Sequence, residues 1–140
     1  MNRKIKFRAK HIHVMPCNEH LNGTWVYGYL ADDIYIHSPD LEGEFLIDPN
    51  TVGQYIGIKD TNGKEIFEED IIQRDIWEEK IIGEIAWGDM VGAGFYLKVK
   101  QKNGIGFYPM TKGRSDDDDG EMCNDIMLGN IHDNPELLKR

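Results

Sequence analysis

The feature of this sequence that most constrains its fold is a hydrophobic pattern that repeats every two residues. Apolar and polar side chains alternate in short segments such as Ile5–Lys10 and Phe95–Lys100, and no segment keeps a helical period over several turns. This alternation is typical of β-strands that bury one face. Turn-forming residues separate the segments along all 140 residues. The sequence therefore predicts about ten short antiparallel strands and a mainly-β protein.

The strand segments fall into two groups. An N-terminal β lobe is expected over about residues 1–56, and a C-terminal lobe over about residues 57–140. In the first lobe Thr24–Leu30 is the strongest strand segment, because aromatic side chains recur at every second position. A turn at Asp32-Asp33 lies between it and Ile34–His37, so these two segments are expected to form a hairpin.

The C-terminal lobe shows several signals of turns and bends. Asn62-Gly63 predicts a tight hairpin turn, and Gly83 interrupts a strand segment at a point where a bulge or a sharp bend could lie. This order of turns, strands and a bend favours a small SH3-like barrel. Residues 111–121 contain no apolar side chain and are expected to form a mobile loop. Asn134 and Pro135 are typical of a helix start and predict one short C-terminal helix.

Net charge limits the partners that the chain can bind. It has 16 Lys and Arg against 25 Asp and Glu, which gives a net charge of −9 at pH 7. Residues 1–10 contain five basic and no acidic residues, so the remaining 130 residues carry −14. An acidic body repels nucleic-acid phosphates and attracts basic protein surfaces, although the same charge also keeps a protein soluble.

One part of the chain departs from this acidic character. The first strand carries Lys4, Lys6, Arg8 and Lys10 on its polar face, and the next strand carries Trp25 and Tyr27 on one face. Aromatic rings beside basic side chains are typical of surfaces that bind single-stranded nucleic acid. The same pattern fits an aromatic sheet face packed into the core, with lysines that prevent edge pairing. The acidic remainder of the chain favours the core interpretation, so nucleic acid is not the expected partner.

A histidine-rich segment contains the candidate metal ligands. His11, His13, Cys17 and His20 lie within ten residues, and all four side chains can bind zinc. Their spacing lacks the paired short intervals of structural zinc sites, so a polar strand end and loop explain them better. The acidic run Asp116–Asp119 does not complete a calcium loop, because isoleucine stands where a bidentate carboxylate is needed. We therefore expect no metal and no cofactor.

No residue pattern identifies a catalytic site. The two serines, Ser38 and Ser115, lie outside any nucleophile-elbow motif. The carboxylates of Glu68, Glu69 and Asp70 could act as acid–base groups, but a solvated turn before a strand explains them better. The sequence therefore predicts that the protein is not an enzyme.

The sequence also carries signals about its compartment. The basic N-terminus is not followed by the apolar run of a signal peptide, and no segment has the length and hydrophobicity of a membrane span. The two cysteines lie far apart and without a pairing motif. A cytoplasmic location with reduced thiols and no membrane partner is expected.

Four segments carry a longer signal: Ile5–Ala9, Trp25–Tyr29, Ile47–Ile72 and Gly129–Leu138. Together they resemble the YopX family of phage and prophage proteins, in the family's order and over nearly the whole chain. The resemblance implies a single YopX-like domain over residues 1–140, mainly β, in a bacterial host cell, with no catalytic residues to carry over. Family members commonly have glycine where this chain has Glu69, so a positive φ there would strain the backbone.

From these observations we expect a non-enzymatic accessory module of phage or prophage origin. Its expected partner is a host or phage protein, with self-association into a homo-oligomer as a further option. The alternative is a nucleic-acid-binding β module that uses the basic N-terminal strand.

Overall fold

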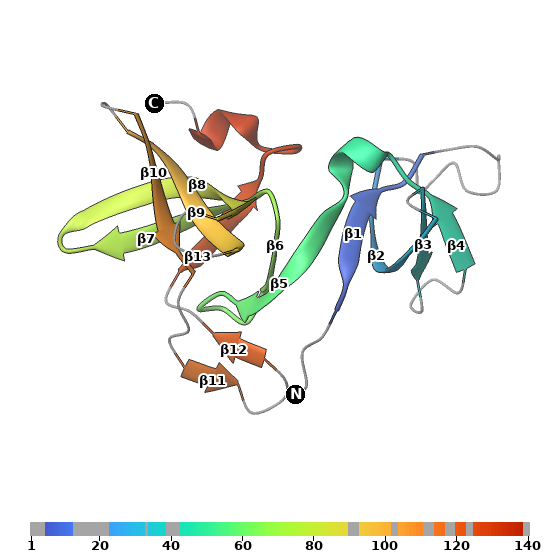
Figure 1. The fold of residues 1–140 in the computed structure, drawn as a ribbon, viewed down its shortest axis with the longest axis horizontal. Helices are drawn as coiled ribbons and strands as arrows, with labels where there is room; N and C mark the ends of the chain where they lie inside the picture. The colour runs from blue at the N-terminus through green and yellow to red at the C-terminus, as the bar shows by residue number, and fades with distance from the viewer. Residues whose placement is uncertain are drawn as a thin grey trace. The chain divides into compact units, whose positions relative to one another are not determined.

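The chain forms two compact units. The N-terminal lobe is Lys4–Tyr55, and the C-terminal lobe contains Ile56–Arg140. Both lobes are mainly β in the computed structural model of the chain (Figure 1). The structure describes residues 5–12, 23–32, 34–38, 43–89, 93–101, 104–110, 114–116, 120–122 and 125–138. In this described part of the chain, no helix is long and apolar enough to cross a membrane.

The sheet of the N-terminal lobe follows from the alternation of apolar and polar side chains in its segments. Its described strands are β1 (Phe7–Lys10), β2 (Trp25–Ala31), β3 (Tyr35–Ser38), β4 (Gly43–Leu46) and the first residues of β5 (Gly53–Lys59). The strand order is β5-β1-β2-β3-β4, and each neighbouring pair is antiparallel.

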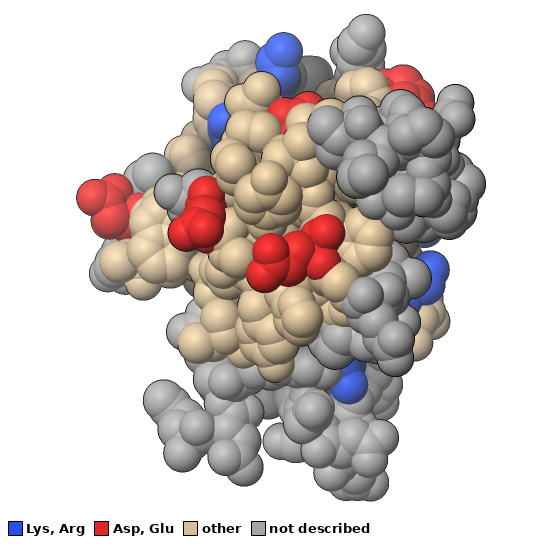
Figure 2. Space-filling view, turned by 90° about the vertical axis from the view of Figure 1, so that its right-hand side faces the viewer, with Lys and Arg blue, Asp and Glu red and all other residues tan. Residues whose placement is uncertain are grey.

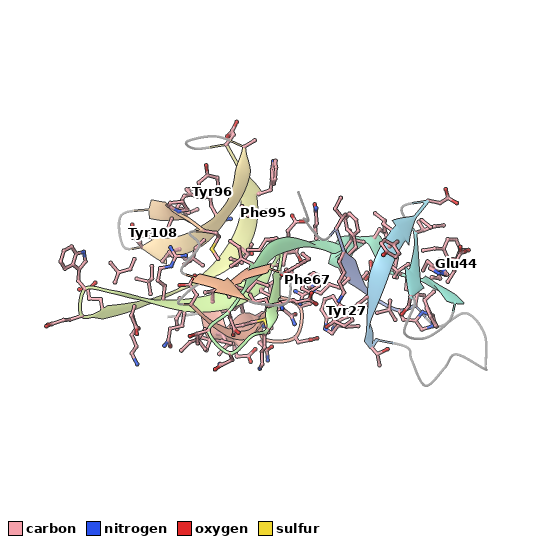
Figure 3. The ribbon with its side chains drawn as sticks, turned by 90° about the horizontal axis from the view of Figure 1, so that it is seen from below. Tyr27, Glu44, Phe67, Phe95, Tyr96 and Tyr108 are labelled. Atoms are coloured by element: carbon pink, nitrogen blue, oxygen red, sulfur yellow. The ribbon has the colours of Figure 1, made fainter. Side chains whose placement is uncertain are left out.

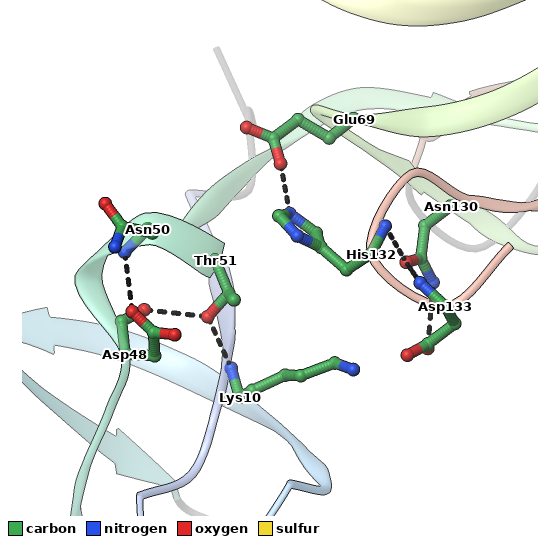
Figure 4. Close-up of polar contacts among 8 residues, drawn as sticks. All are labelled: Lys10, Asp48, Asn50, Thr51, Glu69, Asn130, His132 and Asp133. Carbon is green, nitrogen blue, oxygen red and sulfur yellow. Dashed lines mark hydrogen bonds and ion pairs between the residues drawn. The ribbon is translucent and has the colours of Figure 1, made fainter. Parts of the chain in front are cut away.

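A short polar turn joins β4 to β5. The 3₁₀ turn η2 (Pro49–Thr51) starts at Asp48, whose Oδ1 accepts the Asn50 N–H at 3.0 Å. The Thr51 hydroxyl donates to the Asp48 carbonyl at 2.7 Å and accepts the Lys10 N–H at 2.9 Å (Figure 4). These bonds attach the turn to the end of β1.

The core of the N-terminal lobe lies on one face of its sheet. Its buried side chains are Ala9, Val26, Ile36, Phe45 and Ile47. Ala9 lies opposite Val26, and Ile36 lies opposite Phe45. The two side chains of each pair therefore point to the same side of the sheet. Small and β-branched side chains therefore supply most of this core.

The aromatic row of β2 lies on the opposite face from this core. Side chains alternate along a strand, so the burial of Val26 turns Trp25 and Tyr27 to the outer face. Both rings are only half-buried, and Tyr29, the next in the row, is 60% exposed. The interpretation of this row as a core face is therefore wrong.

The C-terminal lobe contains a five-stranded antiparallel sheet in the order β10-β9-β8-β7-β13. Its strands are β7 (Asp70–Ile76), β8 (Glu79–Gly88), β9 (Gly94–Gln101), β10 (Gly104–Pro109) and β13 (Ile126–Asn130). The end of β5 pairs with β6 (Glu65–Phe67) and, in parallel, with β12 (Gly120–Met122). β12 also pairs with β11 (Arg114–Asp116). The buried core of this lobe comprises Ile56, Ile58, Ile66, Ile72, Ile85, Leu97 and Val99.

Three expectations for this lobe are corrected. The closed SH3-like barrel is not confirmed, because in the described ranges β10 and β13 end the sheet without pairing with each other. The C-terminal helix is instead a 3₁₀ turn, η3 (Pro135–Leu138). Residues 111–121, expected to be a loop, include β11 and the start of β12, since main-chain pairing needs no apolar side chain.

A buried carboxylate shapes the turn between β5 and β6. Asp60 is fully buried, and its Oδ1 accepts the N–H groups of Asn62 and Lys64, each at 2.9 Å. Its Oδ2 accepts the Met127 N–H of β13 at 3.0 Å. The tight turn predicted at Asn62-Gly63 is confirmed, with Gly63 at a φ of +81°. One side chain thus forms the turn and attaches it to another strand.

Gly83 lies in β8 at a point where the backbone of β9 approaches closely. It pairs in regular register with Ile72, so no bulge is present there. A Cβ at position 83 would lie 2.4 Å from the carbonyl oxygen of Lys98 and 2.9 Å from Cγ2 of Val99. Close approach, rather than a bulge, accounts for this glycine.

Gly83→Ala is expected to lower the free energy of unfolding by about 1–3 kcal/mol, because the added methyl group pushes the β9 backbone away. Gly94→Ala is the matched control, since a Cβ at that position meets no atom within 4 Å. Urea denaturation of both variants measures the difference. Equal losses of stability would contradict this role for Gly83.

Candidate functional site

The basic and aromatic residues singled out in the sequence do come together on the outer face of β1 and β2. The guanidinium carbon of Arg8 lies 4.5 Å from the ring centroid of Trp25, and Nζ of Lys10 lies 5.5 Å from it. Nζ of Lys6 lies 5.7 Å from the ring centroid of Tyr27. We call these five residues the basic–aromatic face. Lys4, the remaining predicted member, lies outside the described residues.

The cations of this face already contact the rings beside them. Arg8 is only 5% exposed, and the rings of Trp25 and Tyr27 are half-buried. A nucleic-acid base could stack on these rings only by displacing side chains that lie over them. The exposed ring of Tyr29 is the open end of the row. The face is therefore a stabilised part of the lobe with limited open surface.

His11 is a core residue of the N-terminal lobe. It is 2% exposed, and its Nδ1 lies 2.9 Å from the carbonyl oxygen of Leu46, a hydrogen bond that requires the proton on Nδ1. Its ring meets the Phe45 ring edge-on, with 5.4 Å between centroids. The other predicted metal ligands, His13, Cys17 and His20, lie outside the described residues. The described ranges contain no group of three or more His, Cys, Asp or Glu that could hold a metal ion.

Two of the acidic residues singled out in the sequence, Glu69 and Asp70, lie where β7 begins and connect parts of the C-terminal lobe. Asp70 is 1% exposed, and its Oδ2 accepts the Phe67 N–H at 2.7 Å. Glu69 has a φ of +71°, so the strain expected at this non-glycine position is present. Its N–H donates to the Ile85 carbonyl at 2.8 Å, and its own carbonyl accepts the Ile131 N–H at 3.0 Å.

The side chain of Glu69 contacts His132 in the turn that follows β13. Its Oε2 meets Nε2 of His132, and both side chains are partly exposed (Figure 4). Asn130 sets the position of His132, because its Oδ1 accepts the N–H groups of His132 at 3.0 Å and Asp133 at 2.9 Å. A carboxylate and an imidazole in contact can transfer a proton. Here the contact connects the turn before β7 with the turn after β13.

A buried ion pair crosses between β7 and the residue before β13. Arg74 Nε donates to Asp125 Oδ1 at 2.8 Å, and Arg74 Nη2 donates to Oδ2 at 2.7 Å. The side chain of Asp125 is only 3% exposed. Arg74 Nη1 also donates to the Pro109 carbonyl at 3.1 Å. The arginine thus fixes the base of the β7–β8 hairpin.

The tip of this hairpin carries a residue that the sequence interpretation missed. Ile76 and Glu79 form the last pair of β7 and β8, so Trp77 and Glu78 are the two turn residues. Trp77 is 94% exposed and has a φ of +56°. The hairpin projects from the C-terminal lobe (Figure 1). The signal that could have pointed to Trp77 is its position between two strand segments, because the residues usual in such a turn are Gly, Asn and Asp.

A hollow of about 580 Å³ lies beside this turn. We call it the Trp77 hollow; its lining residues are Ile76, Trp77, Glu78, Glu79, Ile81, Gln101 and Tyr108. Tyr108, labelled in Figure 3, comes from β10, an edge strand of the five-stranded sheet, and its hydroxyl accepts a hydrogen bond from Gln101 Nε2 at 2.8 Å. Isoleucine side chains, two glutamates and the exposed indole of Trp77 therefore line the same hollow.

The fold and these contacts define a two-lobed, mainly-β protein in which the buried polar groups described above serve the fold. The profile of the YopX protein family matches residues 6–139, so the chain belongs to this family. Protein EF1440 from Enterococcus faecalis has a similar crystal structure, with a TM-score of 0.50 and 25% sequence identity over 99% of this chain and 100% of that chain. Comparison with curated proteins gives no match.

Glu69→Gly is expected to be more stable than Glu69→Ala by about 1 kcal/mol. Both variants lose the contact with His132, but only glycine adopts a φ of +71° without strain. Thermal denaturation compares the two proteins directly. An alanine variant as stable as the glycine variant would show that position 69 stores no strain.

Proposed function

We propose that the chain is a non-enzymatic accessory module of phage or prophage origin that binds another protein. The observation that carries this proposal is Trp77, an almost fully exposed tryptophan at the tip of the β7–β8 hairpin. Membership of the YopX family supports the phage origin, and we place its action in the cytoplasm of a bacterial host cell.

Folding gives no reason for tryptophan at this position. A buried tryptophan stabilises a protein by removing apolar surface from water, but Trp77 is 94% exposed. Its φ of +56° adds strain that glycine would not have. Tryptophan is enriched among the residues that dominate protein–protein binding energy. A contact with a partner therefore explains what folding does not.

The charge around the turn supports a protein partner of opposite sign. Asp75, Glu78 and Glu79 are exposed there, with Lys80 as the neighbouring base. Acidic side chains around an aromatic anchor increase the association rate with basic surfaces and weaken binding as salt rises. On the side of β3 and β4, which faces the viewer in Figure 2, acidic side chains lie scattered among uncharged ones rather than in a single field.

Pull-down from bacterial lysate with the purified chain as bait tests this function. The wild-type protein is expected to retain a specific partner that Trp77→Gly loses, because the anchor is removed and the turn is relaxed. Trp87→Phe is the matched control, since Trp87 is 59% exposed but packs edge-on against Phe95 with 5.0 Å between centroids. Retention of the same partners by all three proteins, or no partner at low salt, would contradict the proposal.

A second candidate function rests on the basic–aromatic face. Three cations lie over two aromatic rings there, and exposed Tyr29 extends the row. Bases can stack on such rings while the cations neutralise phosphates, which is how many single-strand-binding sheets work. The burial of Arg8 and the acidic charge of the chain make this the weaker candidate.

This second function predicts that a labelled oligothymidylate binds the protein with an affinity that falls steeply between about 50 and 200 mM salt. Replacing Lys6 and Lys10 by alanine together is expected to weaken binding by about tenfold or more, because two phosphate contacts are lost. Fluorescence anisotropy measures both effects. Absence of binding at the lower salt concentration excludes this function.

A further inference from the structure

We propose that the Trp77 hollow binds the cationic side chain of a partner protein, with arginine preferred over lysine. This inference rests on the proposed protein-binding function and adds the chemistry of the group that is recognised. The carrying observation is that the exposed Trp77 and two glutamates line one hollow together with two isoleucines.

The first step is the charge of the hollow. Its seven lining residues include Glu78 and Glu79 and no basic side chain. The nearest base in sequence, Lys80, is the cross-strand partner of Asp75. Side chains alternate along each strand, so this pair lies on the other face of the hairpin from Ile76 and Glu79. The hollow therefore presents negative charge to whatever enters it.

The second step is the exposed ring. A cation within about 6 Å of an indole face is attracted by the ring quadrupole, and tryptophan is the best of the aromatic side chains for this contact. The chain already contains such a pair, because the guanidinium of Arg8 lies 4.5 Å from the ring centroid of Trp25. Trp77 presents the same chemical group with 94% of its surface open to solvent.

The third step separates arginine from lysine. A guanidinium is planar and weakly hydrated, so it can stack on an indole while its edge donates two hydrogen bonds to a carboxylate. An ammonium group is compact and strongly hydrated, and it gains less from a flat apolar surface. Ile76 and Ile81 line the hollow beside the carboxylates and provide such a surface for the methylene stem of an arginine.

Hexa-arginine, hexa-lysine and hexa-glutamate peptides serve as probes in a titration followed by the indole N–H signals in ¹H–¹⁵N NMR spectra. The chain has three tryptophans, and the Trp77 signal is assigned by its loss in Trp77→Phe. We expect hexa-arginine to shift the Trp77 signal, hexa-lysine to bind several-fold more weakly and hexa-glutamate to have no effect. Binding that follows charge alone, with equal affinity for both basic peptides, would overturn the arginine preference.

Two variants test whether the hollow itself binds the peptide. Trp77→Gly is expected to lose at least about tenfold in hexa-arginine affinity while its melting temperature stays equal or rises, because the strained φ is relieved. Glu78→Gln with Glu79→Gln keeps the ring and is expected to lose about tenfold. Trp87→Phe is expected to bind normally.

The possible failures remain distinguishable from one another. If no peptide shifts the Trp77 signal but the pull-down partner is still lost in Trp77→Gly, cation recognition is wrong and the protein-binding function stands. If the peptide shifts the signal of Trp25 but not that of Trp77, the site is wrong, because binding then occurs at the basic–aromatic face. If neither assay depends on Trp77, both the function and this inference fail.

Discussion

Burying a carboxylate costs several kcal/mol unless an opposite charge or several hydrogen bonds compensate for the loss of water. In the C-terminal lobe the bidentate pair of Arg74 and Asp125 meets this requirement, and Asp60 meets it with main-chain N–H groups. These contacts join β7, the β5–β6 turn and the start of β13. Arg74 lies in β7, three residues before Trp77. Its ion pair with Asp125 therefore attaches the β7–β8 hairpin to the rest of the lobe close to the exposed turn.

The two lobes use aromatic residues and charge in opposite ways. In the N-terminal lobe the cations lie over half-buried rings, so ring and cation satisfy each other within the chain. At the β7–β8 turn the ring is exposed and its charged neighbours in the hollow are acidic. An internal pair of this kind stabilises a surface, whereas the exposed ring at the turn has no cation over it among the residues that line the hollow, and under the function proposed above a partner supplies that cation.

Much of the fold could be predicted because strand alternation and turn chemistry are local properties. The Asn62-Gly63 turn and the strands of both cores are examples, and the strain at Glu69 followed from a resemblance that commonly has glycine there. Which face of β2 is buried was not local, because it depends on the strand that pairs with β2, where Ala9 lies opposite Val26. Closure of a barrel depends on pairing between distant strands, and the exposure of Trp77 depends on a backbone angle that composition does not reveal.

The two-residue turn between β7 and β8 lies outside the hydrogen-bonded part of the hairpin. Ile76 and Glu79 complete the ladder of hydrogen-bonded pairs, so positions 77 and 78 contribute no rung to it. Substitution there leaves the sheet register and the core unchanged, provided that the turn geometry is kept. Under the function proposed above, related chains can change the surface that they recognise by substituting only these two residues, while the strands that carry the turn stay the same.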